Sequence, residues 1–159
     1  MASRVAVRRA QERDVESVAG LIARLKALNG ELDPHFLPAG DLEARAREYV
    51  AKSLGSDNAF ILVAEDEQAG RIVGVIRVEL VDRVFYKPRI KAVITDFYVH
   101  PAYRGKRIGR LLVEKAQEEA KARGAGLITA VYPEGNIIAD SFYSRMGFRP
   151  LQKELYKPL

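Results

Sequence analysis

The sequence predicts an α/β (α+β) protein, built as a mixed sheet with helices on its faces. Two observations support this prediction. Segments with strand-like and helical hydrophobic patterns follow one another in the order β-α-α-β-β-β-α-β-α-β. The chain has 159 residues, of which 48% are hydrophobic and 30% charged. This is ordinary globular composition with enough length for one core, so we expect residues 1–159 to form a single domain.

One strand and two helices are predicted before the main sheet. Residues 5–8 alternate weakly and predict a short strand. Apolar residues three or four apart then form one helical stripe: Val15, Val18, Ile22 and Leu25. This helix is expected to end near Asn29-Gly30. Two prolines exclude regular helix over 33–38. Asp41 is expected to cap a second helix that ends near Ser53.

Three strands are predicted next, over residues 59–65, 71–81 and 91–99. A glycine inside the second of them, Gly74, indicates a bulge or a close backbone approach. In the third strand, strict alternation divides the side chains between two faces. One face would hold Val93, Thr95, Phe97 and Val99, and the other Ile94, Asp96 and Tyr98.

The second half of the chain predicts two more helices. A basic loop leads into a helix that ends near Arg123, with Gly124 as its C-cap. A strand over 127–132, a turn and a short helix over 136–146 follow. The tail to Leu159 is expected to form a last pair of short strands.

Composition excludes several classes of function. The chain has no cysteine and two histidines, which argues against a disulfide framework, a thiolate zinc site and a cysteine nucleophile, and we expect no metal. No apolar run is long enough to span a membrane. The N-terminal segment, residues 1–14, has no apolar core or cleavage pattern, so no signal peptide is expected. We therefore expect a cytoplasmic protein with no membrane partner.

The strongest local signal is a basic, glycine-bearing loop over residues 104–110, between a strand and a helix. A helix N-terminus offers unpaired N–H groups and the positive end of its dipole, and glycine lets a ligand oxygen approach. Basic side chains at that end oppose the helix dipole and do not favour folding. Binding of an anion therefore explains their presence better than a contribution to stability does. The loop therefore predicts binding of a pyrophosphate. The alternative is a solvated charged surface, and the motif is neither a P-loop nor a dinucleotide fingerprint.

Two motifs resemble those of the GNAT N-acetyltransferase superfamily. The first follows Val99-His100-Pro101 and matches the loop pattern Gln/Arg-x-x-Gly-x-Gly/Ala, from Arg104 to Gly109. The second matches Asn-x-x-Ala-x-x-Phe-Tyr-x-x-x-Gly-Phe through Asn136, Ala139, Phe142, Tyr143, Gly147 and Phe148. One position departs from the family pattern, because Arg107 stands where the family has its first glycine. The element order matches the family over nearly the whole chain.

The resemblance implies a central, mixed, mostly antiparallel twisted sheet flanked by about four helices, with acetyl-CoA as co-substrate. It implies that the loop amides hold the pyrophosphate: Gly105, Lys106, Arg107, Ile108, Gly109 and Arg110. Arg104 would order the loop or pair with phosphate. The backbone of Phe97, Tyr98 and Val99 would pair with the pantetheine arm as with an added strand. Residues 129–132 would form the other wall, and Asn136 would bind a pantetheine amide.

Tyr143 is the expected general acid in a direct attack of an amine on the thioester. Thiols have a pKa near 8.5 and tyrosine one near 10, so a positioned phenol can protonate the departing sulfur. The alternative is a core aromatic. Asp96 is the first candidate for a general base, although it could equally hold a loop in place, and Glu79 is the second. His100 has a suitable pKa but lies toward the pyrophosphate end. His35 and Phe36 are candidates for the wall of the acceptor pocket.

The expected function is transfer of an acetyl group from acetyl-CoA to a primary amine. The acceptor could be a protein N-terminus, a lysine, an amino acid, an aminoglycoside or a small amine. Some members of the resembled family that acetylate diamines carry an acidic residue immediately before the position of Asp96. Here that residue is Thr95, which weakens the case for polyamines. The main alternative is a non-catalytic acetyl-CoA sensor of the same fold. Nucleic-acid binding through the net charge of +5 ranks last, since the basic loop lacks interleaved exposed aromatics. The terminal strands of this fold often pair across a dimer, so a homodimer is possible.

Overall fold

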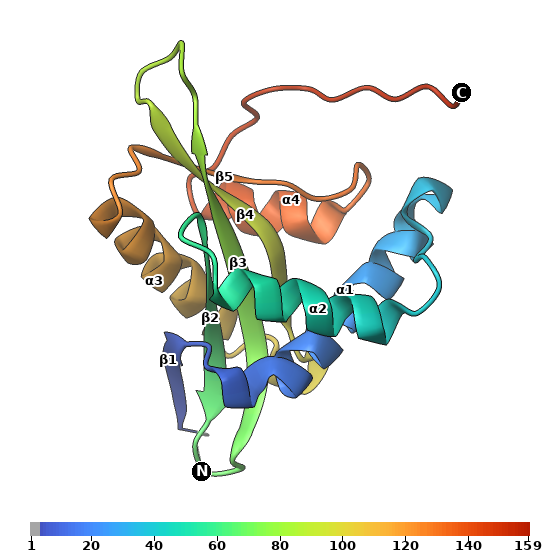
Figure 1. The fold of residues 1–159 in the computed structure, drawn as a ribbon, viewed down its shortest axis with the longest axis vertical. Helices are drawn as coiled ribbons and strands as arrows, with labels where there is room; N and C mark the ends of the chain where they lie inside the picture. The colour runs from blue at the N-terminus through green and yellow to red at the C-terminus, as the bar shows by residue number, and fades with distance from the viewer. Residues whose placement is uncertain (1–3) are drawn as a thin grey trace.

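The computed structural model describes residues 4–159 and contains one five-stranded sheet in the order β1-β2-β3-β4-β5 (Figure 1). Neighbouring strands are antiparallel except β4 and β5, which are parallel. The strands are β1 Val5–Arg9, β2 Ala59–Asp66, β3 Arg71–Asp82, β4 Ile90–Val99 and β5 Leu127–Ala130. The predicted mixed, mostly antiparallel sheet is therefore confirmed. Residues 1–3, which begin the segment expected to lack a signal peptide, lie outside the described residues.

Four helices cover the two faces of the sheet, each with its own core. The helices are α1 Val15–Leu32, α2 Leu42–Leu54, α3 Ile108–Ala122 and α4 Ile137–Arg145. Helices α1 and α2 pack on one face, where Ile61, Val63 and Val75 are buried. Helices α3 and α4 pack on the other face, over residues such as Phe60, Leu62 and Ile76. Because both faces are covered, β2 reads as a continuous apolar run and not as an alternating one.

The glycine inside β3 marks both a bulge and a close approach. The pairing of β2 with β3 shifts register between Ala64 and Glu65, opposite this part of β3. A Cβ added to Gly74 would lie 3.0 Å from Leu112 Cδ1 of α3. The absence of a side chain therefore lets α3 lie directly on the sheet.

Two helix boundaries differ from expectation. Helix α1 continues through Gly30 to Leu32. The glycine does not end the helix but leaves room for the chain that returns after it, since an added Cβ would lie 3.2 Å from the Phe36 carbonyl oxygen. Asp41 does precede α2, but it does not cap it through its side chain. It adopts the left-handed conformation (φ 58°), and only its carbonyl oxygen is used, accepting from the Arg45 N–H.

The predicted faces of β4 are wrong on one side of Thr95. In the pairing with β3, Arg77 lies opposite Asp96 while Val78 lies opposite Ile94. Thr95 is thus the extra residue of a β-bulge, which resets the alternation. Ala92 and Ile94 consequently share the α3 face with Phe97 and Val99, and Tyr98 packs on the opposite face against α1 and α2.

The expected pair of strands in the tail is also wrong. Residues 149–159 have no regular secondary structure and every residue is exposed. No backbone hydrogen bond joins them to the rest of the described chain. Pro150 has no N–H to donate, and the tail leaves α4 as a separate red line in Figure 1. A strand pattern forms a strand only where a sheet edge is within reach, and here the chain leads away from β5.

Within residues 4–159, no helix combines the length and the apolar character that crossing a membrane requires.

Candidate functional site

The loop between β4 and α3 presents a row of free backbone amides. A 3₁₀ turn over Pro101–Tyr103 follows β4, and Gly105 has a φ of +80°. The first backbone hydrogen bond into α3 runs from the Leu111 N–H to the Arg107 carbonyl oxygen. The N–H groups of residues 105–110 donate to no atom of residues 4–159. Six adjacent free amides at a helix N-terminus form an array that fits a multiply charged anion.

Arg107 occupies the N-cap position of α3 in a conformation that favours glycine. Its φ of 64° and ψ of 13° are left-handed, and its side chain is exposed. An arginine with a side chain thus stands in a left-handed conformation where the family pattern has a glycine. The left-handed region costs a residue with a side chain roughly 1–2 kcal/mol.

Arg104 and Gly109 hold this loop against the sheet. The Arg104 Nε donates to the Val99 carbonyl oxygen at 3.1 Å, and its guanidinium carbon lies 5.4 Å from the centre of the Tyr98 ring. A Cβ on Gly109 would lie 3.0 Å from Phe97 Cζ. The glycine therefore allows the first turn of α3 to rest on the ring of Phe97, which stacks on Phe142 at 5.2 Å.

The edge of β4 beyond Ile94 is open on the β5 side. Pairing with β5 covers Lys91 to Ile94, and the Val131 N–H donates the last bond to the Ile94 carbonyl oxygen. The segment 95–99, which includes Phe97, Tyr98 and Val99, pairs only with β3. The two parallel strands thus part at the bulge and leave a backbone edge that an extended ligand can join.

Two stacked tyrosines lie beyond the end of β5. The rings of Tyr132 and Tyr143 are 5.5 Å apart and almost parallel, at 7°. Tyr143 is 5% exposed, and its hydroxyl has no hydrogen-bond partner within residues 4–159. Burial, followed by the neighbouring Tyr132, raises the pKa of Tyr143 well above its usual value. Burial and the hydrogen bond to Asp140 raise the pKa of Tyr132 to about 12.

Asn136 precedes α4 as its N-cap. Its Oδ1 accepts from the Ala139 N–H at 3.0 Å. This leaves the side-chain NH₂ group free to donate to a ligand. Asn136 thus caps the start of α4, and Tyr143, seven residues later, places a buried phenol near the end of the same helix.

Asp96 is held by groups from three elements on the other face of the sheet. Its side chain is 0% exposed. Its Oδ2 accepts from the Tyr49 hydroxyl at 2.5 Å and from the Thr95 hydroxyl at 2.9 Å. Its Oδ1 accepts no hydrogen bond of regular geometry and is matched by the Lys26 ammonium group, 2.5 Å away. Burial, followed by the charge of Asp96, raises the pKa of Tyr49.

A buried arginine continues this network into β3. Arg77 is 6% exposed and donates to Ser53, Glu79 and Thr95. Its guanidinium carbon lies 4.3 Å from the centre of the Tyr49 ring. Glu79, the second candidate base, is thus engaged in an ion pair at 2.7 Å and is 43% exposed.

Sequence reasoning missed Lys26 and Tyr49 as partners of Asp96, and Arg77 as the buried cation on the Tyr49 ring. Two signals were available. Lys26 lies four residues after the buried Ile22, so it falls on the inward side of its helix. Arg77 is the one charged residue in the run from Ile72 to Val78. Buried cations of this kind need a carboxylate partner.

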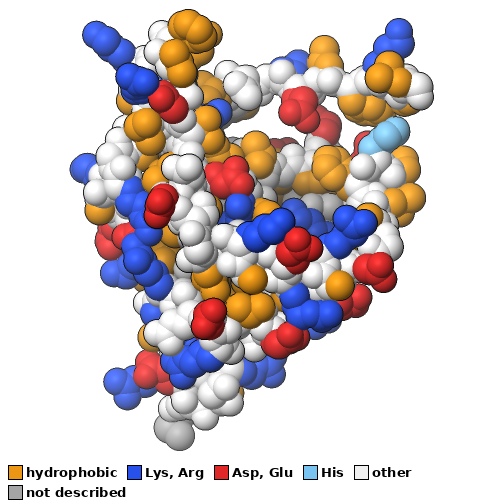
Figure 2. All heavy atoms as spheres, in the orientation of Figure 1, with side chains coloured by type: hydrophobic (Ala, Val, Ile, Leu, Met, Phe, Trp, Pro, Cys, Tyr) orange, Lys and Arg blue, Asp and Glu red, His pale blue; other side chains and the backbone are white. Residues whose placement is uncertain are grey.

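Neither histidine ring packs on Tyr132 or Tyr143. His100 Nδ1 accepts from the Ala102 N–H, and burial followed by nearby arginines lowers the pKa of this imidazole. His35 lies in the 3₁₀ turn between α1 and α2, hydrogen-bonded to Asp33, with its ring 4.5 Å from that of Tyr156 in the tail. Phe36 beside it is 47% exposed. Figure 2 shows a hollow on this face between the tail and the body of the protein.

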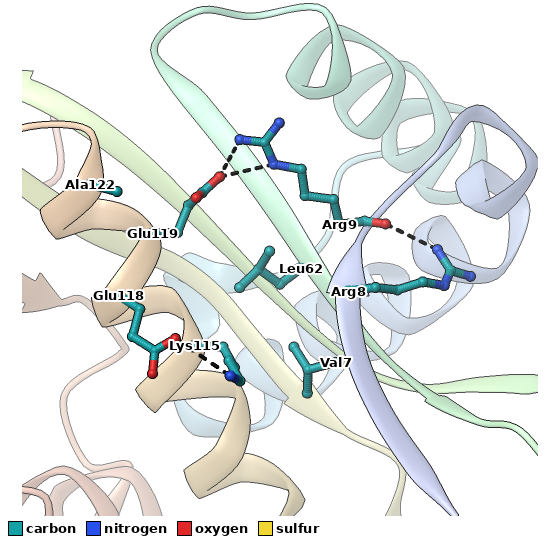
Figure 3. Close-up of a pocket in the computed structure, with 8 residues that line it drawn as sticks. All are labelled: Val7, Arg8, Arg9, Leu62, Lys115, Glu118, Glu119 and Ala122. Carbon is teal, nitrogen blue, oxygen red and sulfur yellow. Dashed lines mark hydrogen bonds and ion pairs between the residues drawn. The ribbon is translucent and has the colours of Figure 1, made fainter.

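A separate cavity of about 360 Å³ lies between β1 and α3 (Figure 3). Arg9 and Glu119 form an ion pair beside it, and Leu62 forms its floor. None of its eight lining residues belongs to the amide loop, to the open edge of β4 or to the tyrosine pair. We therefore place the candidate site at the loop and the parted strands.

Comparisons with known proteins identify the family. The model of the acetyltransferase (GNAT) family matches residues 25–148. Glucosamine 6-phosphate N-acetyltransferase 1 of Oryza sativa subsp. japonica is 35% identical over 117 residues, which are 70% of this chain and 67% of that protein. An uncharacterized N-acetyltransferase of Methanocaldococcus jannaschii is 39% identical over 66 residues, covering 42% of this chain and 28% of its own length. The part of the chain that matches thus covers between 28% and 67% of the length of these relatives.

The fold is also similar to that of a solved structure. A predicted acetyltransferase of Clostridium acetobutylicum, determined with acetyl-CoA, superposes with a TM-score of 0.78 at 19% identity, over 98% of this chain and 96% of that one. Because the family model covers most of the chain and includes the amide loop and α4, the protein belongs to the acetyltransferase (GNAT) family.

Proposed function

We propose that this protein is an acetyl-CoA-dependent N-acetyltransferase that acts on a primary amine by direct transfer. One observation supports this most strongly. The six free amides of the loop adjoin an open strand edge, and beyond the parting strands lie the buried phenol of Tyr143 and its stacked partner. A pyrophosphate followed by an extended amide-bearing arm is the ligand that such a succession of groups fits.

The residues present fit the co-substrate. The amides of residues 105–110 would hold the pyrophosphate, with Arg104 ordering the loop through Val99. The backbone of residues 97–99 would pair with the pantetheine arm, and the Asn136 NH₂ group would donate to one of its amides. Bound acetyl-CoA supplies the acetyl thioester.

Tyr143 would supply the proton that the departing sulfur needs. Its raised pKa keeps the hydroxyl protonated at neutral pH, whereas a thiol has a pKa near 8.5. Transfer to a finished thiolate would therefore run uphill, so the phenol would donate to the sulfur in contact with it as the C–S bond breaks, and the proton that the attacking amine loses would restore the hydroxyl. The absence of a partner for the hydroxyl within residues 4–159 leaves it free for this contact.

Asp96 remains the predicted base, but its contacts support a positioning role better. Its buried carboxylate is already engaged by an ammonium group and two hydroxyls, two of which come from α1 and α2. We propose that it fixes α1 and α2 beside the bulge of β4. A base role predicts that Asp96→Asn changes the pH profile of kcat/KM, whereas a positioning role predicts a lower kcat with the same pH profile.

The acceptor class is best searched with a panel of amines. The rice relative acts, by its name, on glucosamine 6-phosphate, so this amino sugar belongs in the panel beside lysine, peptides, aminoglycosides and small diamines. Release of free thiol from acetyl-CoA gives the readout.

The decisive variant is Tyr143→Phe. It should lower kcat with the best acceptor by about 10²–10³, in the range expected for losing a general acid. Acetyl-CoA affinity by calorimetry should stay within twofold. Tyr86→Phe, at an exposed hairpin tip, is the matched control and should change neither quantity. Binding of acetyl-CoA without turnover of any amine would support the sensor alternative and contradict the enzyme.

We also propose a homodimer. The tail exposes Leu151, Leu155 and Tyr156 without backbone partners, and β5 is an edge strand without a charged residue. Such an edge invites pairing with a second chain. Analytical ultracentrifugation should show a dimer at micromolar concentration and a monomer after removal of residues 149–159. A monomeric full-length chain would refute this proposal.

A further inference from the structure

The C-terminal tail, residues 149–159, starts beside the proposed general acid. The ring of Phe148, the residue before the tail, lies 5.1 Å from the ring of Tyr143, and the Phe148 N–H donates to the Tyr143 carbonyl oxygen at 2.9 Å. From this point the tail runs in one extended line away from α4, toward the end of α1 (Figure 1). The tail therefore leaves from the place where the proposed reaction would occur.

Two contacts hold the tail along this path. Near its start, Leu151 and Gln152 line a cavity of about 410 Å³ together with Val81 and other residues of the hairpin between β3 and β4. Four residues after Gln152, the ring of Tyr156 lies 4.5 Å from the ring of His35, in the turn between α1 and α2. The tail thus reaches from the hairpin to the α1–α2 turn.

The histidine that meets Tyr156 is held in place by its own turn. The Asp33 carboxylate accepts from the His35 N–H at 2.7 Å and lies 3.0 Å from Nδ1 of the same residue. These contacts fix the orientation of the imidazole, so its ring is already placed for the tyrosine. Aromatic rings at this separation attract one another beyond the effect of the area they bury.

The part of the tail between the two contacts bridges an opening. We call residues 149–156 the strap. Figure 2 shows the hollow between the tail and the body of the protein. Only residues 153–155 separate Gln152 from Tyr156, so the Cα atoms of these two residues are at most about 14 Å apart. The strap is exposed throughout and has no backbone hydrogen bond to the rest of the described chain, so it can open without unfolding the sheet.

The strap lies on the side from which an acceptor would approach. Under the proposed function, the co-substrate occupies the amide loop and the open edge of β4, and its thioester lies near Tyr143. The acceptor then needs a separate approach, and the hollow that the strap crosses adjoins Tyr143 through Phe148. A small free amine can pass an opening about 14 Å wide. The surface of a folded protein would meet the strap before its amine reached the thioester.

We propose that the strap selects the class of acceptor: it admits small free amines and excludes amines carried by folded proteins, with the contact of Tyr156 and His35 as its latch. This proposal rests on the proposed function, because it concerns the acceptor of the same reaction. Of the acceptors that the sequence leaves open, it favours amino acids, amino sugars and other small amines over protein N-termini and protein lysines.

The first test compares one amine in two sizes. The small amine of the panel with the highest kcat/KM is used free and coupled through a short linker to a folded carrier protein, so that the reacting group is the same. The unaltered protein should use the coupled amine with a kcat/KM lower by about tenfold or more. Tyr156→Ala and His35→Ala should each reduce this difference to about threefold, because the aromatic contact that closes the strap is lost. The kcat for the free amine should stay within about twofold, since neither ring touches the reacting atoms.

Leu159→Ala is the matched control, since this exposed residue lies beyond the latch. It removes an apolar side chain from the same tail and should leave the difference between the two amines unchanged. Tyr156→Phe keeps the ring and should behave like the unaltered protein. The variant with both His35→Ala and Tyr156→Ala should differ little from either single variant, because the two substitutions remove the same contact. His35 lies outside the tail, so its variant carries the test if sedimentation shows that Tyr156→Ala alters the oligomeric state.

The second test does not depend on activity. Arg149 and Lys157 precede prolines, which protect them from trypsin, so Lys153 is the one cleavable site in the tail. It lies between the two contacts of the strap. Where opening is fast, a protease acts on the open form, so the two latch variants should each speed cleavage after Lys153 about threefold to tenfold. The Leu159→Ala control should not. Mass spectrometry of the released peptide, residues 154–159, gives the rate.

The outcomes separate this proposal from the proposed function. Equal use of the free and the coupled amine by the unaltered protein, a difference that persists in both latch variants, or cleavage that neither variant changes would each overturn the role of the strap. Each would leave the acetyltransferase proposal intact. Absence of turnover with every amine, free or coupled, would overturn both.

Discussion

At the scale of single residues, Arg107 is the clearest conflict between local preference and structure. It adopts a left-handed conformation at the start of α3 and adds a positive charge where the helix dipole is already positive. Neither property favours folding. Under the proposed function, its exposed guanidinium, one residue before the helix, would meet a phosphate.

Arg107→Gly should therefore stabilise the free protein. Relief of left-handed strain, about 1–2 kcal/mol, exceeds the extra backbone entropy of glycine, about 0.4–1 kcal/mol. The expected net gain is about 0.5–1 kcal/mol in the free energy of unfolding by urea. Arg110→Gly, within the same helix, is the control and should destabilise by about 1 kcal/mol. A loss of stability in both variants would refute the strain argument.

At the scale of elements, buried ion pairs join helices to strands. Lys26 of α1 and Tyr49 of α2 both meet Asp96 of β4, so one carboxylate connects three elements beside the bulge. At the β1 edge of the sheet, the Arg8 guanidinium donates two hydrogen bonds, of 2.7 and 3.0 Å, to the Asp14 carboxylate just before α1. Both pairs set where α1 lies on the sheet.

Lys26→Met should lower the free energy of unfolding by about 1–3 kcal/mol. Removing one partner of a buried pair leaves a charge uncompensated, and the estimate is below the range for fully buried pairs because Lys26 is 39% exposed. Lys115→Met, which breaks the exposed pair with Glu118, should cost less than about 0.5 kcal/mol. Equal effects of the two substitutions in chemical denaturation would contradict the role assigned to Asp96.

The Asp14 pair should make stability depend on pH. The hydrogen bonds from Arg8 hold the pKa of Asp14 below its usual value. Because the folded pKa is lower than the unfolded one, near 3.9, this carboxylate stabilises the protein above about pH 4 and loses its contribution as the pH falls through the folded pKa. Asp14→Asn should cost about 2 kcal/mol at pH 7, and the difference from the unaltered protein should shrink toward pH 3. Asp57→Asn, in an exposed turn, should show no such trend.

At the scale of the whole molecule, a sheet covered on both faces positions a basic loop at one end of the parted strands. The protein carries a net charge of +5, and within residues 4–159 no acidic side chain lies within 4.0 Å of Arg104, Lys106 or Arg107 of the loop. Attraction of an anionic ligand to such exposed charges is screened by salt.

Acetyl-CoA affinity should therefore fall several-fold between about 50 and 500 mM sodium chloride, where the Debye length shortens from roughly 14 to 4 Å. Acetyl-pantetheine, which lacks all three phosphates, is the control ligand and should bind with little dependence on salt. Calorimetry or inhibition measurements would decide. A similar salt dependence for both ligands would show that the cations do not act on phosphate.

The sequence by itself determined the order of the elements as far as α4, the loop before α3 and the position of Asn136 and Tyr143 at the two ends of one helix, because these depend on local spacing, on glycine and on capping. It could not determine the faces of β4, since one extra residue at Thr95 reverses the alternation and only the pairing with β3 shows it. Nor could it show that Lys26 and Tyr49 meet Asp96, or that Arg77 lies on the ring of Tyr49. Those contacts join residues far apart in the chain, and the packing of α1 and α2 on the sheet decides them.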